Sequence, residues 1–113
     1  MQYLLLIFAS EKEPIPETEY PKMMADYGTF TKDIIASGHF KGGERLKPSD
    51  TASTVRVRGG KTLTTHGPFA ETHEQLGGYY LVEAKDLDEA VAIAARIPGA
   101  RHGSIEVRPI APM

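Results

Sequence analysis

The feature that most constrains the fold is an uninterrupted apolar run near the start of the chain. From Tyr3 to Phe8 the only polar group is the tyrosine hydroxyl. A half-buried strand alternates between apolar and polar residues, whereas a continuous run is typical of a strand covered on both faces. The run is also far too short for a membrane span, which needs about 20 residues. We therefore expect a central strand with a covering layer on each side.

Two amphipathic segments are expected to form one of these layers as helices. The first follows Thr18, the expected N-cap, and ends at Gly38. The second follows Asp86, with Glu89 placed for a capping box, and ends at Pro98-Gly99. Their predicted apolar faces are Tyr20, Met23, Met24, Tyr27, Phe30, Ile34 and Ile35 in the first and Leu87, Ala90, Val91, Ile93, Ala94 and Ile97 in the second.

The remaining strands complete a predicted α+β fold. Gly59-Gly60 is expected to turn a hairpin. Removing that hairpin from the predicted order β-α-β-β-β-β-α-β leaves βαββαβ, the ferredoxin-like arrangement. The strands after the first are expected at 39–46 (with a bulge at Gly42-Gly43), 53–58, 61–65, 77–84 and 104–108.

Size and pattern together predict a single domain, residues 1–113, that works as a homodimer. A chain of 113 residues is long enough for one domain only. In the ferredoxin-like arrangement both helices cover the same sheet face, so the other face stays bare. Because the strands carry apolar or aromatic residues on both faces, we expect a second copy to cover the bare face.

Composition excludes several classes of function. A formal net charge of −2 without a basic stripe gives nucleic-acid binding no electrostatic support. The chain has no cysteine, which excludes disulfides and thiolate chemistry and suits a cytoplasmic setting. The apolar run lacks a basic leader and a cleavage site, so we expect neither a signal peptide nor membrane insertion.

A long motif in the second half of the chain carries a family resemblance. The stretch Thr65-His66-Gly67-Pro68-Phe69-Ala70-Glu71-Thr72-His73-Glu74-Gln75-Leu76-Gly77-Gly78-Tyr79-Tyr80 resembles the signature of the YCII-related, or DGPF, family. The match extends to Leu87-Asp88-Glu89-Ala90, Ile97-Pro98 and Ile105-Glu106-Val107-Arg108-Pro109, and upstream to Tyr3-Leu4-Leu5-Leu6-Ile7 and Gly42-Gly43-Glu44-Arg45-Leu46.

The resemblance implies a dimeric α+β barrel, in which two ferredoxin-like sheets face each other. Some relatives resemble small enzymes that use a His–Asp pair, including a dehydrochlorinase, and others are linked to extracytoplasmic-function sigma factors. One residue departs from the family pattern. The family motif begins with aspartate, where this chain has His66, which differs in charge and reach.

His66 and Glu71 are the first candidates for acid–base chemistry. Histidine exchanges a proton near neutral pH, and His66 ends a predicted strand at a Gly-Pro break. Glu71, five residues later, would orient the imidazole or accept a proton itself. The structural alternative is that Glu71 caps a short turn while His66 satisfies local backbone groups.

Glu44 and Tyr79 are the second pair of candidates. Glu44 follows two glycines that let a ligand approach the backbone, so its carboxylate is expected to face the barrel interior. Its alternative role is a salt bridge with a neighbouring arginine. Tyr79 and Tyr80 point to opposite faces of one strand, so one packs under the helices and the other offers its hydroxyl to a ligand. In the alternative, both simply pack.

No cofactor or metal site is expected. The four histidines, His39, His66, His73 and His102, lack the tight spacing of a helix-borne metal site. The glycine pairs read as strand and turn glycines rather than a phosphate cradle. Arg45, Arg56 and Arg58 are expected mostly as solvated charges at strand edges, but guanidinium groups also bind carboxylates and phosphates, so a small anionic or phenolic ligand is the alternative.

Two main hypotheses of function follow, besides a third in which the pocket exists but His66, in place of the family's aspartate, has removed an ancestral activity. In the first, the chain is a small-molecule enzyme of lyase or isomerase type, with His66 as acid or base, Glu71 or Glu44 as its partner and Tyr79 as a hydrogen-bond donor. In the second, it is a non-catalytic ligand-binding or regulatory dimer, tied to an extracytoplasmic-function sigma factor. A concave pocket with convergent polar groups favours the first, and a filled interior the second.

Overall fold

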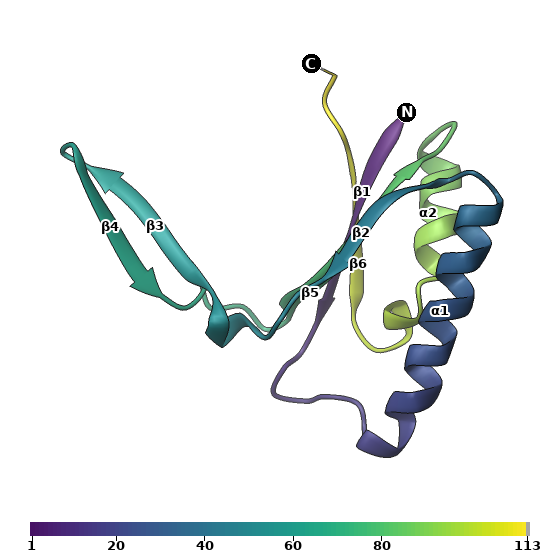
Figure 1. The fold of residues 1–113 in the computed structure, drawn as a ribbon, viewed down its shortest axis with the longest axis horizontal. Helices are drawn as coiled ribbons and strands as arrows, with labels where there is room; N and C mark the ends of the chain where they lie inside the picture. Colours follow the sequence, from purple (N-terminus) through teal and green to yellow (C-terminus); the bar gives the residue numbers. More distant parts are fainter. Residues whose placement is uncertain (113) are drawn as a thin grey trace.

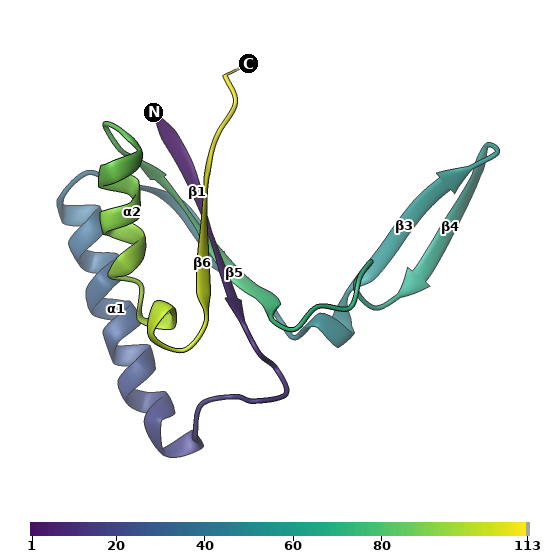
Figure 2. The same cartoon turned by 180° about the vertical axis from the view of Figure 1, so that it is seen from behind.

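A four-stranded antiparallel sheet with two helices on one face forms the body of the molecule (Figure 1). The structure is a computed structural model and describes residues 1–112. The view from behind shows the same layering, with the second sheet, a lone hairpin, on the side away from the helices (Figure 2). The elements are β1 (Gln2–Ala9), η1 (Glu17–Glu19), α1 (Tyr20–Ala36), β2 (Phe40–Arg45), η2 (Ser49–Thr51), β3 (Ser53–Arg58), β4 (Lys61–His66), β5 (Gln75–Glu83), α2 (Leu87–Ala95), η3 (Pro98–Arg101) and β6 (Ser104–Pro109).

The strand order confirms the ferredoxin-like fold. The sheet runs β2-β5-β1-β6, so β1 is central and each helix connects two strands that have a third strand between them. The inserted hairpin β3–β4 forms a sheet of its own. Gly59 and Gly60 at its turn have φ of 58° and 76°, the left-handed values that a type I′ turn requires at both central positions. The predicted irregularity in β2 is present as a register shift between Phe40 and Gly42.

The core lies between the sheet and the helices. From β1 and β5 the buried side chains are Tyr3, Leu5 and Val82, and the helices add Phe30, Ile34 and Ile93. Tyr80 packs on the same side, with its ring 5.2 Å from that of Phe30 in an edge-on arrangement. One tyrosine of the Tyr79-Tyr80 pair therefore packs under the helices, as the sequence predicts.

Three details of the helices differ from the sequence prediction. Thr18 is not the N-cap of α1, because it lies inside the 3-10 turn η1 and the helix begins at Tyr20 without a side-chain cap. Some residues predicted on the apolar faces are exposed in α1 (Ile35 54%, Tyr20 42%, Met24 40%) and in α2 (Leu87 51%, Val91 48%). In contrast, Asp86 caps α2 as predicted by accepting the Glu89 N–H at 2.9 Å.

The sheet face opposite the helices has no cover within residues 1–112. Leu4, Leu6 and Phe8 of β1 point to this face because they alternate with the core residues Tyr3 and Leu5. Each of the three is only partly buried. On the helix side Tyr3 and Leu5 of β1 are buried, whereas the residues of β1 on the other face, which we call the helix-free face, stay partly exposed.

Candidate functional site

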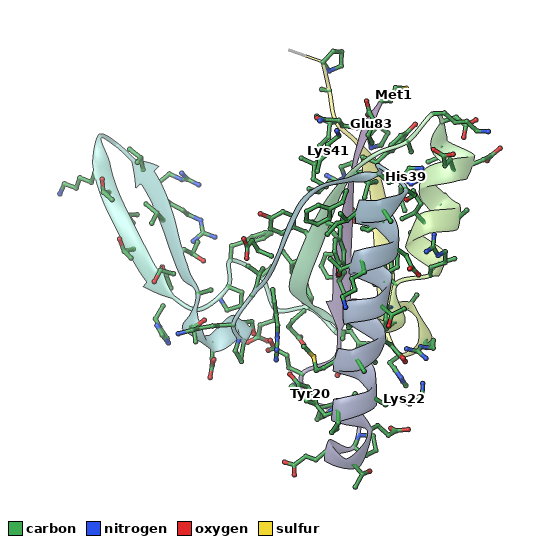
Figure 3. All side chains as sticks on the ribbon, turned by 45° about the vertical axis from the view of Figure 1, so that its right-hand side comes forward. Met1, Tyr20, Lys22, His39, Lys41 and Glu83 are labelled. Atoms are coloured by element: carbon green, nitrogen blue, oxygen red, sulfur yellow. The ribbon has the colours of Figure 1, made fainter. Side chains whose placement is uncertain are left out.

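A cavity of about 590 Å³ opens between α1 and the β2–β5 edge of the sheet. Its wall is mostly apolar, with a few polar groups, which is the usual character of a small-molecule site. In Figure 3, Tyr20 marks the end of the body where α1 begins, opposite the end that holds Met1 and Glu83. The lining residues used below are Tyr20, Met23, Met24, Tyr27 and Thr31 from α1, Glu44 and Arg45 from β2, Tyr79 and Tyr80 from β5, and Gly99 and His102 from the segment before β6.

Arg45 and Tyr20 form the most distinctive polar pair of the cavity. The Arg45 guanidinium donates a hydrogen bond to the Tyr20 hydroxyl, and its carbon lies 5.6 Å from the centre of the Tyr20 ring. Both side chains are exposed. No carboxylate forms an ion pair with Arg45 anywhere in residues 1–112. Arg45 therefore places a positive charge on the cavity wall with donors free for an anion.

Deeper in the cavity, two tyrosine hydroxyls are fixed by hydrogen bonds. The Tyr27 hydroxyl accepts the Gly99 N–H at 3.2 Å. Burial raises the pKa of Tyr27 above its usual value of 10.0, so the phenol stays protonated and remains able to donate. The Tyr80 hydroxyl shares a 2.7 Å hydrogen bond with the Thr31 hydroxyl. These groups can accept or donate to a ligand that is otherwise apolar.

Glycines bring the surrounding backbone close to the cavity. A Cβ at Gly99 would lie 2.6 Å from the Tyr27 hydroxyl oxygen. A Cβ at Gly43 would lie 2.8 Å from the Tyr79 carbonyl oxygen and 3.0 Å from the Tyr80 ring. Both distances are shorter than real Cβ contacts, so larger residues at either position would displace a tyrosine that lines the cavity.

Two of the four predicted site residues are brought together. Glu44 and Tyr79 are direct partners across β2 and β5. Arg45 contacts α1, so strand alternation turns the adjacent Glu44 side chain, and with it Tyr79, towards the helix-free face. Leu6 and Glu106 continue this row across the sheet. Glu44 and Tyr79 thus border the cavity at the sheet edge but present their side chains on the other side.

The other two predicted residues lie elsewhere. His66 is the last residue of β4, opposite Ser53, and Glu71 follows in the loop before β5. Both are exposed, and neither lines the cavity. No hydrogen bond or ion pair joins them among the described residues, so their partnership stays a prediction.

Among the cavity's main polar groups, the sequence singles out Arg45 as a candidate for binding an anion, but not Tyr20, Tyr27 or Thr31. Tyr20, Tyr27 and Thr31 recur at helical spacing, and for the two tyrosines that spacing predicts a core-facing stripe rather than a polar cavity wall. His102 also lines the cavity, although its sequence context suggested only a loop. The helical period does predict that these side chains share a face, but not that the sheet stops short of covering it.

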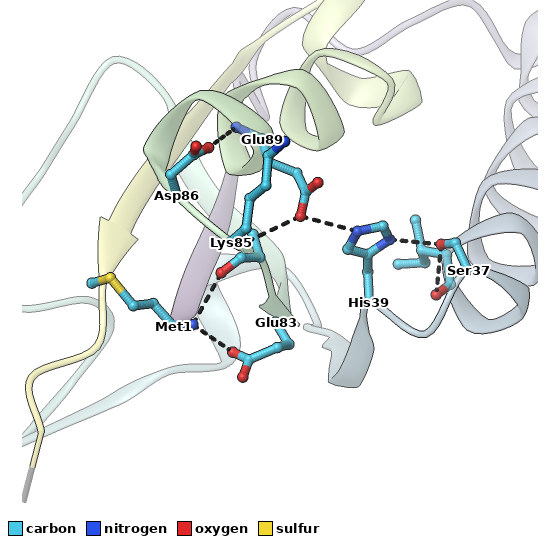
Figure 4. A network of polar contacts seen from close by, with 9 residues as sticks. Met1, Ser37, His39, Glu83, Lys85, Asp86 and Glu89 are labelled. Atoms are coloured by element: carbon cyan, nitrogen blue, oxygen red, sulfur yellow. Dashed lines mark hydrogen bonds and ion pairs between the residues drawn. The ribbon is translucent and has the colours of Figure 1, made fainter.

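A separate polar network lies at the far end of the body (Figure 4). His39 Nε2 is 3.2 Å from the Glu89 carboxylate, and His39 Nδ1 is 2.7 Å from the Ser37 hydroxyl. The Glu89 carboxylate also accepts the Lys85 N–H at 3.0 Å. The Lys85 N–H, followed by His39, holds the pKa of Glu89 below its usual value. These contacts join α2 to the end of α1 and have a structural role.

Two further properties concern all of residues 1–112. No cluster of three or more His, Asp or Glu side chains in this part of the chain could hold a metal ion. In the same residues, neither helix has the length and apolar character needed to cross a membrane.

Comparison with known proteins gives two matches. The family model described as the YCII-related domain matches residues 1–113. An uncharacterised protein of Rhizobium meliloti (strain 1021) is 36% identical over 115 residues, which cover 98% of this chain and 93% of that protein.

Proposed function

The chain belongs to the YCII-related domain family, and from this premise we propose that it is a cytoplasmic homodimer that binds a small, largely apolar acid. The ligand lies in the cavity beside α1, with its apolar part among Met23, Met24 and the tyrosine rings. Its carboxylate accepts hydrogen bonds from Arg45. The observation that carries the proposal is a guanidinium on an apolar wall with no carboxylate partner in the described residues.

The geometry favours an aromatic acid over an aliphatic one. Tyr20, Tyr27 and Tyr80 line the cavity from two sides, and aromatic rings prefer edge-on or offset stacking partners. The protonated phenol of Tyr27 and the Thr31–Tyr80 pair offer hydrogen bonds to a ring substituent such as a hydroxyl. This combination supports the small anionic or phenolic ligand expected from the sequence.

Binding of simple aromatic acids tests the proposal. Benzoate, phenylacetate and 4-hydroxyphenylacetate, each with its neutral amide as the matched probe, would be titrated by ligand-observed NMR and calorimetry. We expect the acids to bind at least tenfold more tightly than the amides, because a charge-assisted hydrogen bond contributes about 1.5–3 kcal/mol.

Arg45→Gln should remove this preference. Arg58→Gln serves as the control, because Arg58 lies on the hairpin outside the cavity. Equal affinity for acid and amide in the wild type, or an equal loss in both variants, would contradict the proposed site.

The homodimer would form through the helix-free face. Leu4, Leu6 and Phe8 from β1 and Leu81 from β5 give this face an apolar centre. At its edge, Glu106 and Arg108 form an ion pair at 2.6 Å. Burying such a face against an identical one would complete the covering of β1 and enclose Glu44 and Tyr79 between the two sheets.

The enclosed Glu44–Tyr79 pair favours a second candidate function, acid–base catalysis of lyase or isomerase type. A carboxylate and a phenol on adjacent strands can take and return a proton at one substrate carbon. His66 and Glu71 would join this chemistry only if they approach in the assembly. The test is a panel of small phenolic and halogenated acids with wild type, Glu44→Gln and His66→Asp. Turnover that survives Glu44→Gln unchanged would exclude this role of Glu44.

A further inference from the structure

The β3–β4 hairpin, residues 53–66, projects from the body as an arm. In both views it diverges from the sheet on the side away from the helices (Figures 1 and 2). The radius of gyration is 16.0 Å, against about 13 Å for a compact domain of this size. At its base the Gly67 N–H donates to the Ala52 carbonyl at 2.7 Å, and the Thr54 hydroxyl donates to the Gly67 carbonyl at 2.8 Å. Beyond this base, β3 and β4 pack chiefly against each other.

The two faces of the arm differ in character. The strand register places Val55 opposite Thr64 and Val57 opposite Thr62, which gives one face of β-branched, uncharged side chains. Both valines are 60% exposed. The other face carries the arm's cations, which are Arg56, Arg58 and Lys61.

The arm exposes open strand edges and apolar side chains, which contact with another protein surface would cover. A two-stranded hairpin alone is marginally stable in water, and both strands of this one are open edges. Exposed valines add apolar surface that folding has not covered. Phe69, just beyond the base, is 80% exposed and adds an aromatic side chain of the kind that anchors interfaces.

The charge of the arm indicates what kind of surface would be complementary to it. The arm contains no carboxylate, and its three cations form no ion pair within residues 1–112. The whole chain has a formal charge of −2, so the remainder is acidic. Exposed acids gather before α1, at Glu11, Glu13, Glu17 and Glu19. The body of a second copy therefore offers the arm opposite charge, and two-fold symmetry makes the contact twice.

We propose that the arm of each protomer clasps the body of a second copy of this chain. The helix-free face and the arm diverge from a common base, so a protomer on that face lies alongside the arm (Figure 1). The inference rests on the proposed homodimer and adds a second contact surface to it. The uncharged face of the arm and Phe69 supply apolar contact, and its cations approach the partner's acidic segments.

Cross-linking between chains tests the clasp directly, and the absence of native cysteine allows a single reactive site. Thr62→Cys, on the uncharged face, would carry a short photo-cross-linker in a mixture of ¹⁵N-labelled and unlabelled chains. We expect cross-linked peptide pairs of mixed label that join the arm to the partner's body. Ala92→Cys on the exposed side of α2 is the control and should give no such pairs.

Dimer dissociation constants provide the second measurement. Val55→Ser combined with Val57→Ser should raise the constant at least tenfold, as should Arg56→Glu combined with Arg58→Glu. The controls Val91→Ser and Lys32→Glu, exposed positions on the helices, should change it less than twofold.

The outcomes separate the two proposals. The clasp is overturned, and the dimer is kept, if three results occur together. The wild type sediments as a dimer, it gives no mixed-label cross-links from the arm, and the arm variants behave as the controls do. A wild type that stays monomeric overturns both. Arm cross-links that appear only to an added nucleic acid or another protein also overturn the clasp.

Discussion

At the scale of single residues, the cavity depends on a few groups whose neighbours set their chemistry. Arg45 is available to an anion because, within residues 1–112, its only side-chain partner is the uncharged Tyr20. Tyr27 stays protonated because burial disfavours its phenolate, although the Gly99 N–H partly offsets that effect. Asp26, by contrast, accepts hydrogen bonds from Lys22 and Arg101, and these lower its pKa. Its carboxylate therefore makes contacts at the surface of α1 rather than in the cavity.

Tyr27→Phe should remove a tyrosine whose ionisation burial shifts to higher pH. The folded-state pKa of Tyr27 is raised, so its contribution to stability is complete below the unfolded-state value of about 10 and is lost as pH rises through the folded-state value. The wild type should therefore lose stability in alkali more steeply than the variant. At neutral pH the variant should lose about 1 kcal/mol with the hydrogen bond to Gly99.

Absorbance of tyrosinate against pH, together with urea unfolding at each pH, measures both effects. Tyr79→Phe is the matched control, since that tyrosine lies on the helix-free face, and it should leave the late ionisation in place. An unchanged alkaline titration in Tyr27→Phe would contradict the assignment.

At the scale of elements, sequence patterns do not reveal how closely β2 packs against β5 beside the cavity. Gly42 and Gly43 are adjacent in β2, yet only Gly43 has a crowded neighbourhood. Strand alternation separates them, because adjacent residues point to opposite faces of the sheet and Gly43, the direct partner of Tyr80, is the one that faces the Tyr80 ring. Two glycines that look equivalent in the sequence thus have different roles.

Gly43→Ala should lower the free energy of unfolding by about 1–3 kcal/mol, as expected when a side chain is forced into a filled space. The added methyl would lie 2.8 Å from the Tyr79 carbonyl oxygen. Gly42→Ala, which meets open space, should change the same quantity by less than about 0.5 kcal/mol. Urea unfolding monitored by circular dichroism distinguishes them, and equal losses would show that the edge is less tightly packed than described.

At the scale of the whole molecule, the two layers of the body are unequal. Helices α1 and α2 cover one face of the sheet, and nothing in residues 1–112 covers the other. The partly exposed Leu4, Leu6 and Phe8 lie at the centre of that bare face. The arm projects on the same side. The helix-free face and the arm thus face the same region of space, where a single partner can contact both.

Leu6→Lys should convert the proposed dimer into a monomer, because it places a charge in the apolar centre of the helix-free face of each copy, and an ion pair with the neighbouring Glu106 would not offset the cost of burying that charge. Ile35→Lys is the control, since Ile35 is already exposed on α1, and it should leave the association unchanged. Sedimentation velocity over a range of concentrations measures the outcome. A Leu6→Lys protein that still associates like the wild type would move the interface elsewhere.

The sequence alone determined the elements and their order. The apolar run in β1, the helical period of α1 and α2, the Asp86 cap and the Gly59-Gly60 turn are local signals, each set by residues close together in the chain, and each is present in the structure. From that order the ferredoxin-like topology follows, because short connections leave few other arrangements.

The tertiary structure decided which candidate residues lie together. Arg45, Tyr20 and Tyr80 come from three elements, and the cavity between them depends on how α1 packs against the β2–β5 edge of the sheet. Strand register made Glu44 and Tyr79 neighbours, while the arm's separation from the body placed His66 far from the cavity wall. The physical reason is that contacts between distant segments depend on packing and register, which local patterns do not encode.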